Sequence, residues 1–231
     1  MSAWPQFGEN MSIKATAAVA RNIVLSALIA CSSAAIPFYP GAAADQALVG
    51  QAEIGKKAPD FTLTDINGKS VTLSKLHGKF VVLEWFNDGC PFVKKHYNSG
   101  NMQALQKEYA KKNVVWLSIC SSAAGKQGNH TADDYKKILK DWNAAPAHLL
   151  LDPDGQVGRL YGAKTTPDMF IIAKDGTLQY SGAIDDKADT DVESVKTAKN
   201  YVREALDQLM AGKNVATTST KSYGCSVKYN G

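Results

Sequence analysis

The sequence has few of the residues on which several protein classes depend. Four cysteines in 231 residues are too few for a disulfide-built miniprotein, and they predict a small number of reactive or paired thiols. Only Arg159 and Arg203 follow residue 44, so nucleic acid is not an expected partner, because arginine is the commonest reader of base edges. The chain has no glycine-rich phosphate loop and no internal repeat. With 18 glycines and 8 prolines, it is neither collagen-like nor of low complexity.

The remaining composition is that of a globular protein. Apolar residues make up 45% of the chain and charged residues 21%, which excludes a wholly disordered or fibrous protein. The length predicts one domain with extensions. The formal net charge of +4 is mild.

The first 44 residues have the order of a secretory signal. Lys14 and Arg21 make a basic start, an apolar run covers 23–38, and Ala42-Ala43-Ala44 offers a small-residue cleavage site. The apolar run is too short and too polar in its middle for a secure membrane span. We therefore expect an exported protein of the bacterial periplasm, with 1–44 outside the fold.

An alternative concerns Cys31. The segment Leu28-Ile29-Ala30-Cys31 resembles a bacterial lipobox, under which Cys31 would carry a lipid and the chain would be attached to a membrane. The ordinary signal is preferred, because Ala44 is followed at once by a polar and acidic start. Cys90, Cys120 and Cys225 then remain, and in an oxidising compartment an odd count leaves one thiol unpaired or catalytic.

The pattern of the remaining chain predicts an α/β sandwich with a mixed sheet. Residues 45–212 form the expected domain, and 213–231 form a polar tail that contains Cys225. A hairpin is predicted around Asn67-Gly68. The strands are expected over 61–63, 71–73, 80–86, 114–119, 148–151, 169–172 and 177–181, and the helices from Cys90 onward, from the cap Asn101 to 112, over 131–142 with Thr131 and Asp134 as a capping box, and over 192–211.

Cys90 is the leading candidate nucleophile. It precedes Pro91 at the start of a helix, where unpaired N–H groups and the helix dipole favour a thiolate. Lys94 lies one turn on and adds positive charge, although Lys94 and Lys95 are otherwise expected on a solvated helix face. The polar turn before Cys90 predicts an exposed sulfur. His96 is turned about 120° away on an ideal helix, so it is not expected to be the catalytic base.

Glu84 is the second candidate. It interrupts the apolar strand 80–86, where a carboxylate needs partners or a proton. Burial should raise its pKa and make it a plausible proton carrier.

Two segments resemble the thioredoxin superfamily. Residues 81–95, VVLEWFNDGCPFVKK, resemble its active-site segment, and 165–170, TTPDMF, resemble its cis-proline loop. The resemblance implies that Cys90 is the first cysteine of the motif, Glu84 the buried acid, and Pro167 the cis-proline that presents backbone to a disulfide substrate. It places Thr166, Pro91 and Lys94 in contact with substrate. The second motif cysteine is replaced by Val93.

The opening of the domain resembles the redoxin branch that includes peroxiredoxins. This resemblance rests on the segment 58–63, APDFTL, and on the Asn67-Gly68 hairpin. The implied fold is thioredoxin-like, with a mixed central sheet flanked by helices and an N-terminal hairpin extension. The peroxiredoxin pattern itself is replaced: its peroxidatic cysteine aligns with Val93, its threonine with Cys90, its proline with Phe86 and its arginine near Pro167. Rapid peroxidase chemistry is therefore not expected.

A single attacking thiol needs a second thiol to resolve its mixed disulfide. Cys225 and Cys120 are both candidates, and the anchors Tyr223, Val227 and Tyr229 favour Cys225. A disulfide between Cys90 and Cys225 would dock the tail on oxidation and release it on reduction.

The sequence thus predicts an exported thiol–disulfide oxidoreductase or antioxidant redoxin that needs no cofactor. Its expected partners are protein or small-molecule disulfides, or peroxides, together with an electron donor. One rival is a slow thiol peroxidase that uses a Cys90 sulfenate. The non-enzymatic rival is a metal-handling or binding module built on Cys90, Cys225 and a histidine, although Val93 denies it a close second thiol.

Overall fold

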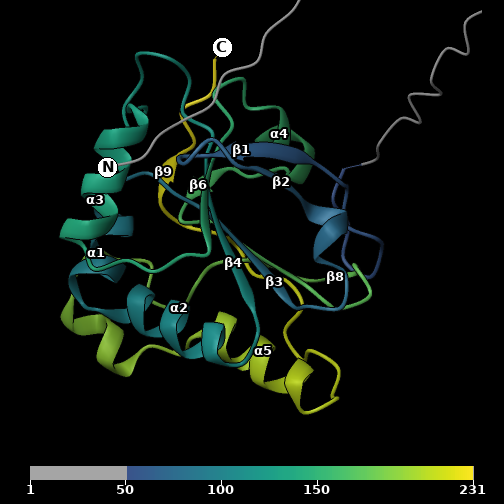
Figure 1. Cartoon of the computed structure of the whole chain (residues 1–231). Coiled ribbons are helices and arrows are strands. Elements are labelled where there is room, and N and C mark those ends of the chain that lie inside the picture. Colours follow the sequence, from purple (N-terminus) through teal and green to yellow (C-terminus); the bar gives the residue numbers. More distant parts are fainter. Residues whose placement is uncertain (1–50, 231) are drawn as a thin grey trace, which may run out of the picture. The chain divides into compact units, whose positions relative to one another are not determined.

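The computed structural model describes residues 51–230, and its centre is a seven-stranded mixed sheet in the order β2-β1-β5-β4-β3-β7-β8 (Figure 1). β6 and β9 form a separate two-stranded ladder. The strands are Thr62–Asp65 (β1), Ser70–Thr72 (β2), Val81–Trp85 (β3), Val115–Cys120 (β4), His148–Leu151 (β5), Thr165–Thr166 (β6), Met169–Ile172 (β7), Leu178–Gly182 (β8) and Cys225–Ser226 (β9). The α-helices are Pro91–Asn98 (α1), Asn101–Lys111 (α2), Ala132–Asp141 (α3), Gln156–Tyr161 (α4) and Tyr201–Met210 (α5), with 3₁₀ turns at Leu73–Leu76 and Glu193–Thr197.

Strand β3 lies at the centre because both of its faces are apolar. It runs parallel to β4 and antiparallel to β7, and all five of its residues are buried. Successive side chains of a strand point to opposite faces. Leu83 and Trp85 join the apolar cluster that includes α4, whereas Val82 and Phe86 join the cluster that includes α2 and α5. The thioredoxin-like fold and its N-terminal hairpin are therefore confirmed.

Local signals explain two of the predicted elements. Gly68 adopts φ +78° in the β1–β2 turn, a conformation that glycine adopts without a steric penalty. Thr131 caps α3: its hydroxyl accepts the N–H of Asp134, and the Asp134 carboxylate accepts the N–H of Thr131. This capping box is confirmed.

The helix predicted over 192–211 is wrong. The chain forms a 3₁₀ turn, becomes extended at Ala198 with ψ 138°, and begins α5 at Tyr201. Asn200 caps the start of α5 by accepting the N–H of Arg203. The cap of α2 is Gly100 rather than Asn101.

The tail, residues 213–230 as described here, is part of the domain. Its backbone bonds to β8 through Ser181, to Lys164 beside β6, and to Ala123 in the loop after β4. The predicted signal 1–44 and Cys31 lie outside the described residues. Within 51–230, no helix is long and apolar enough to cross a membrane.

Candidate functional site

Cys90 caps the N-terminus of α1, directly after β3 and its loop, and Pro91 occupies the first helical turn. This is the position that the sequence predicts. The predicted exposure of Cys90 is wrong, because its exposed fraction is 0%. Its Sγ donates a hydrogen bond to the carbonyl oxygen of Thr166 at 3.0 Å. The polar turn before Cys90 does not open it to solvent, since β6 and the returning tail lie against it.

The tail brings Cys225 to Cys90. Strand β9 pairs antiparallel with β6, and Thr166 is the register partner of Cys225. The Cys225 thiol lies within hydrogen-bonding reach of the Cys90 sulfur. The Thr166-Pro167 peptide bond is cis. The structure therefore gathers Cys90, Thr166, Pro167 and Cys225 at one place.

The two thiols differ in acidity. Burial by itself would raise the pKa of Cys90, but hydrogen bonds from the Cys225 thiol, the Thr166 hydroxyl and backbone N–H groups stabilise the thiolate and lower the pKa overall. Burial, and then the hydrogen bond to Cys90 and its negative charge, raise the pKa of the Cys225 thiol to about 11. Of the two thiols, Cys90 is therefore the one that ionises more readily.

Cys120 has other partners. Its Sγ donates to the carbonyl of Gly128 at 3.2 Å and accepts the hydroxyl of Tyr135 at 3.2 Å. The three cysteines are free thiols among residues 51–230. Of the two candidate resolving thiols, only Cys225 is a hydrogen-bonding neighbour of Cys90.

Glu84 is fully buried and accepts four hydrogen bonds. The donors are Tyr97 Oη at 2.9 Å, Trp116 Nε1 at 2.7 Å, Ser118 Oγ at 2.9 Å and Gln106 Nε2 at 3.4 Å. Burial raises the pKa of Glu84, as the sequence predicts, while the donors oppose the rise. None of these donors is a residue of the thiol pair, so the role of Glu84 as a proton carrier stays a prediction.

The remaining predicted contacts lie at the surface. Pro91 and Lys94 are exposed, and Lys94 forms no ion pair among the described residues. Their role in binding substrate stays a prediction. Lys95 is buried rather than solvated: its Nζ donates to the carbonyl of Lys187 at 2.6 Å and to Asp189 at 3.1 Å. The acidic segment 185–191 supplies the partners that a buried ammonium needs.

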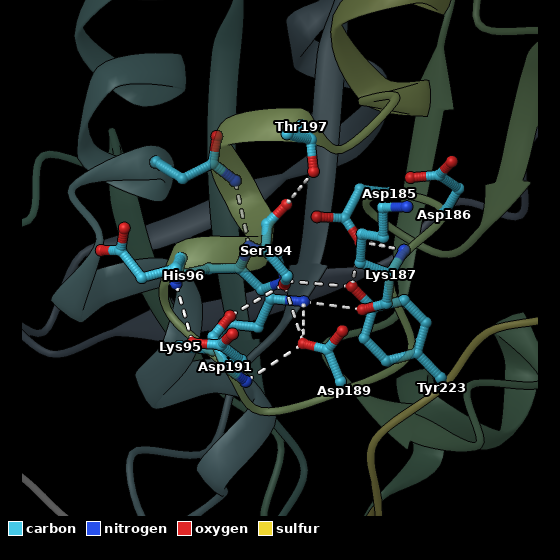
Figure 2. A network of polar contacts seen from close by, with 12 residues as sticks. Lys95, His96, Asp185, Asp186, Lys187, Asp189, Asp191, Ser194, Thr197 and Tyr223 are labelled. Carbon is cyan, nitrogen blue, oxygen red and sulfur yellow. Dashed lines mark hydrogen bonds and ion pairs between the residues drawn. The ribbon is translucent and has the colours of Figure 1, made fainter.

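Two further residues near the site were not predicted. Asp168 follows the cis-proline, accepts the N–H of Lys164 at 3.0 Å and the hydroxyl of Ser222 at 3.3 Å, and burial raises its pKa to about 6. Asp185 accepts the hydroxyl of Tyr223 (Figure 2). A buried acid beside Pro167 could have been noticed within the TTPDMF segment, whereas no sequence signal connects Asp185 to the tail.

Comparisons with known proteins agree on one family. The family model described as the AhpC/TSA family matches residues 54–181. The chain is 28% identical over 155 residues to the thiol-disulfide oxidoreductase ResA of Bacillus thuringiensis subsp. konkukian, which covers 67% of this chain and 82% of that protein. It is 27% identical over 167 residues to the chloroplastic peroxiredoxin Q of Oryza sativa subsp. japonica, which covers 64% of this chain and 65% of that protein.

A solved structure has the same fold. The crystal structure of an uncharacterized conserved protein from Geobacillus kaustophilus matches with a TM-score of 0.66 and 29% identity, over 77% of this chain and 93% of that chain. Among the described residues, no group of three or more His, Cys, Asp or Glu side chains is placed to hold a metal ion.

Proposed function

The chain belongs to the AhpC/TSA family, and from this membership we propose that it is a thiol–disulfide oxidoreductase in which Cys90 attacks and Cys225 resolves. The observation that carries the proposal is the pairing of β9 with β6, which sets the Cys225 thiol beside the Cys90 sulfur although 134 residues separate them in the sequence. Cys225 would resolve the mixed disulfide, the role of the second cysteine of the thioredoxin motif, whose position Val93 occupies here.

In the first step the Cys90 thiolate attacks one sulfur of a substrate disulfide. A bond forms between Sγ and that sulfur, the substrate S–S bond breaks, and the other sulfur leaves as a thiolate and takes up a proton. The lowered pKa of Cys90 increases the thiolate fraction available for this attack. Because Cys90 is buried under β9, the tail must lift before a substrate can reach it.

In the second step Cys225 loses its proton and attacks Sγ of Cys90. The Cys90–Cys225 bond forms, the mixed disulfide breaks, and the second substrate thiolate leaves. One substrate disulfide and two protein thiols thus become two substrate thiols and one protein disulfide. An external dithiol restores the protein by the reverse exchange.

The mixed disulfide also prepares Cys225 for the second step. The negative charge of Cys90 is one cause of the raised pKa of Cys225. Once Cys90 is bonded to substrate it carries no charge, so Cys225 loses its proton more readily. The resolving thiol therefore ionises more readily after the attacking thiol has reacted than before, although burial still raises its pKa.

The change Cys90→Ser should lower the pKa of Cys225 from about 11, by about one pH unit, because it removes the neighbouring negative charge. The pH dependence of the alkylation rate of Cys225, followed by mass spectrometry, measures this. Cys120→Ser is the matched control and should leave the profile unchanged. An unchanged profile in Cys90→Ser would show that the two thiols do not interact.

Peroxidase activity is the second candidate, because the chain is similar to a peroxiredoxin Q. In that route the Cys90 thiolate would break the O–O bond, form a sulfenic acid and release water, and Cys225 would then displace a second water to close the disulfide. The catalytic positions of the peroxiredoxin pattern are replaced in this chain, by Val93, Cys90, Phe86 and Pro167. We therefore expect the peroxidase reaction to be slow.

Reduced protein should react with hydrogen peroxide on the order of 100-fold more slowly than with an aromatic disulfide, since loss of a single donor to a developing oxyanion costs about that factor. Rapid mixing, acid quenching and mass spectrometry of Cys90 give both rates. Faster oxidation by peroxide would make the peroxidase the main activity and contradict the ranking.

We also propose export, which the order of basic, apolar and small residues in 1–44 supports. Disulfides form and persist in an oxidising compartment, so an exported thiol–disulfide oxidoreductase would meet its substrates there. Disulfides are then the expected substrates and a dithiol the expected electron donor.

A further inference from the structure

The tail is docked while Cys90 and Cys225 are both thiols. The expectation that reduction releases the tail is therefore wrong for this structure: contacts other than a sulfur–sulfur bond hold it. These contacts matter for the reaction, because the docked tail covers the attacking thiol and also places the resolving thiol.

Tyr223 contacts two fully buried side chains. It lies two residues before Cys225, and its hydroxyl donates a hydrogen bond to the carboxylate of Asp185 and lies 3.1 Å from Nε2 of His96 (Figure 2). His96 and Asp185 are 0% and 1% exposed. Neither partner can replace the hydroxyl with water while the tail is docked.

The direction of these hydrogen bonds is fixed by a fourth residue. Asn101 Nδ2 donates to Nδ1 of His96 at 3.0 Å, so Nε2 carries the proton of the neutral ring and donates it to Tyr223. Burial, together with the Lys95 ammonium, lowers the pKa of His96 to about 3, which keeps the ring neutral. Asn101 thus donates to His96, His96 donates to Tyr223, and Tyr223 donates to Asp185.

The tyrosine ring also has a fitted place. Its centroid lies 5.8 Å from that of Phe92 and 5.7 Å from Nζ of Lys95, both on α1. Lys95 is itself held by the 185–191 segment. Tyr223 therefore lies between the helix that begins at Cys90 and the segment that carries Asp185.

We propose that Tyr223 is a latch, a positioning residue whose hydrogen bonds to His96 and Asp185 hold β9 on β6. The latch keeps Cys90 covered in the reduced protein and returns Cys225 to it after a substrate has bonded. The second part rests on the proposed function, whereas the first part requires only the docked tail. The latch therefore opposes the first step of the reaction and favours the second.

The change Tyr223→Phe tests this, because it keeps the ring and removes the hydroxyl. Reduced protein is mixed with dithionitrobenzoate, an aromatic disulfide that releases one coloured thiolate when Cys90 attacks and a second when Cys225 resolves. Absorbance follows both phases, and mass spectrometry of acid-quenched samples assigns the cysteine involved. In Tyr223→Phe the first phase should be about tenfold faster and the second about tenfold slower, the effect expected for a lost hydrogen bond of about 1.4 kcal/mol.

Two controls separate a latch from a loosened fold. Tyr201→Phe removes a hydroxyl that has no hydrogen-bond partner in 51–230, and both phases should match the wild type. Cys120, buried elsewhere, should stay unreactive in every variant.

The possible results of this experiment separate a failure of the latch from a failure of the proposed oxidoreductase function. A wild type that releases one thiolate and never closes the Cys90–Cys225 disulfide refutes the proposed function. A wild type with two phases, both unchanged in Tyr223→Phe, leaves the function standing and refutes the latch. Acceleration of both phases, or new reactivity at Cys120, also refutes the latch.

Discussion

Replacing Cys225 with serine should stop the protein after its first exchange. Cys90 would still attack a disulfide, but no neighbouring thiol would release it. Turnover with a dithiol reductant should fall on the order of 100-fold or more, because an intramolecular thiol acts at a far higher effective concentration than a free one. Mixed disulfides through Cys90 should accumulate and be visible by mass spectrometry after non-reducing digestion.

Cys120→Ser is the matched control for this experiment. A serine hydroxyl can keep the contacts that Cys120 makes with Gly128 and Tyr135, so the fold should hold. Its turnover should equal that of the wild type. Full turnover in Cys225→Ser, or loss of turnover in Cys120→Ser, would show that Cys225 is not the resolving thiol.

The change Gly224→Ala should displace β9 from β6. Gly224 has φ +138°, and a Cβ placed on it would lie 2.1 Å from the backbone oxygen of Thr166. A backbone carbonyl that belongs to a paired strand cannot move aside as a flexible side chain can. Cys225 would leave its register partner, so the resolving step should slow on the order of 100-fold, to the rate of a thiol that is no longer held in place.

Hydrogen exchange of residues 222–227 and the alkylation rate of Cys90 measure this displacement, and both should rise. Gly212→Ala is the matched control, because Gly212 also has a positive φ, +69°, but nothing lies within 4 Å of its Cβ position. That variant also places an alanine at a positive φ, but without the clash. Equal exchange rates in the two variants would show that the close approach of Gly224 to Thr166 does not hold the tail.

The sequence predicts the half of the site that is local. Cys90 follows a buried strand and precedes a proline, and both features act within a few residues, so its place at the helix N-terminus could be inferred. Glu84 is a carboxylate in an apolar strand, and its burial and raised pKa follow from the strand alone. These predictions rest on periodicity and capping, which the sequence displays directly.

The other half depends on contacts between distant segments. Nothing near Cys225 indicates that it pairs with Thr166. The anchors in the tail favour Cys225 over Cys120, but its place beside Cys90 could be found only from the backbone of β9. The predicted exposure of Cys90 failed for the same reason, since the tail that covers it comes from the far end of the chain.

Lys95 and the last helix show two further limits. A lysine beside another lysine on a helix is ordinarily solvated, and only the fold brings the acidic segment to Lys95. The apolar spacing of 192–211 fits one helix, yet the chain becomes extended at Ala198 and a new helix begins after the cap Asn200. Asparagine bonds readily to nearby backbone N–H groups, which favours a helix start over a helix interior.

The proposed mechanism requires that Cys90 and Cys225 form one redox pair. The most direct measurement is a disulfide map of the oxidised protein, made by non-reducing digestion and mass spectrometry. We expect a Cys90–Cys225 disulfide within one chain, with Cys120 recovered as a free thiol. A Cys90–Cys120 disulfide, or oxidised protein in which Cys90 remains a thiol, would contradict it.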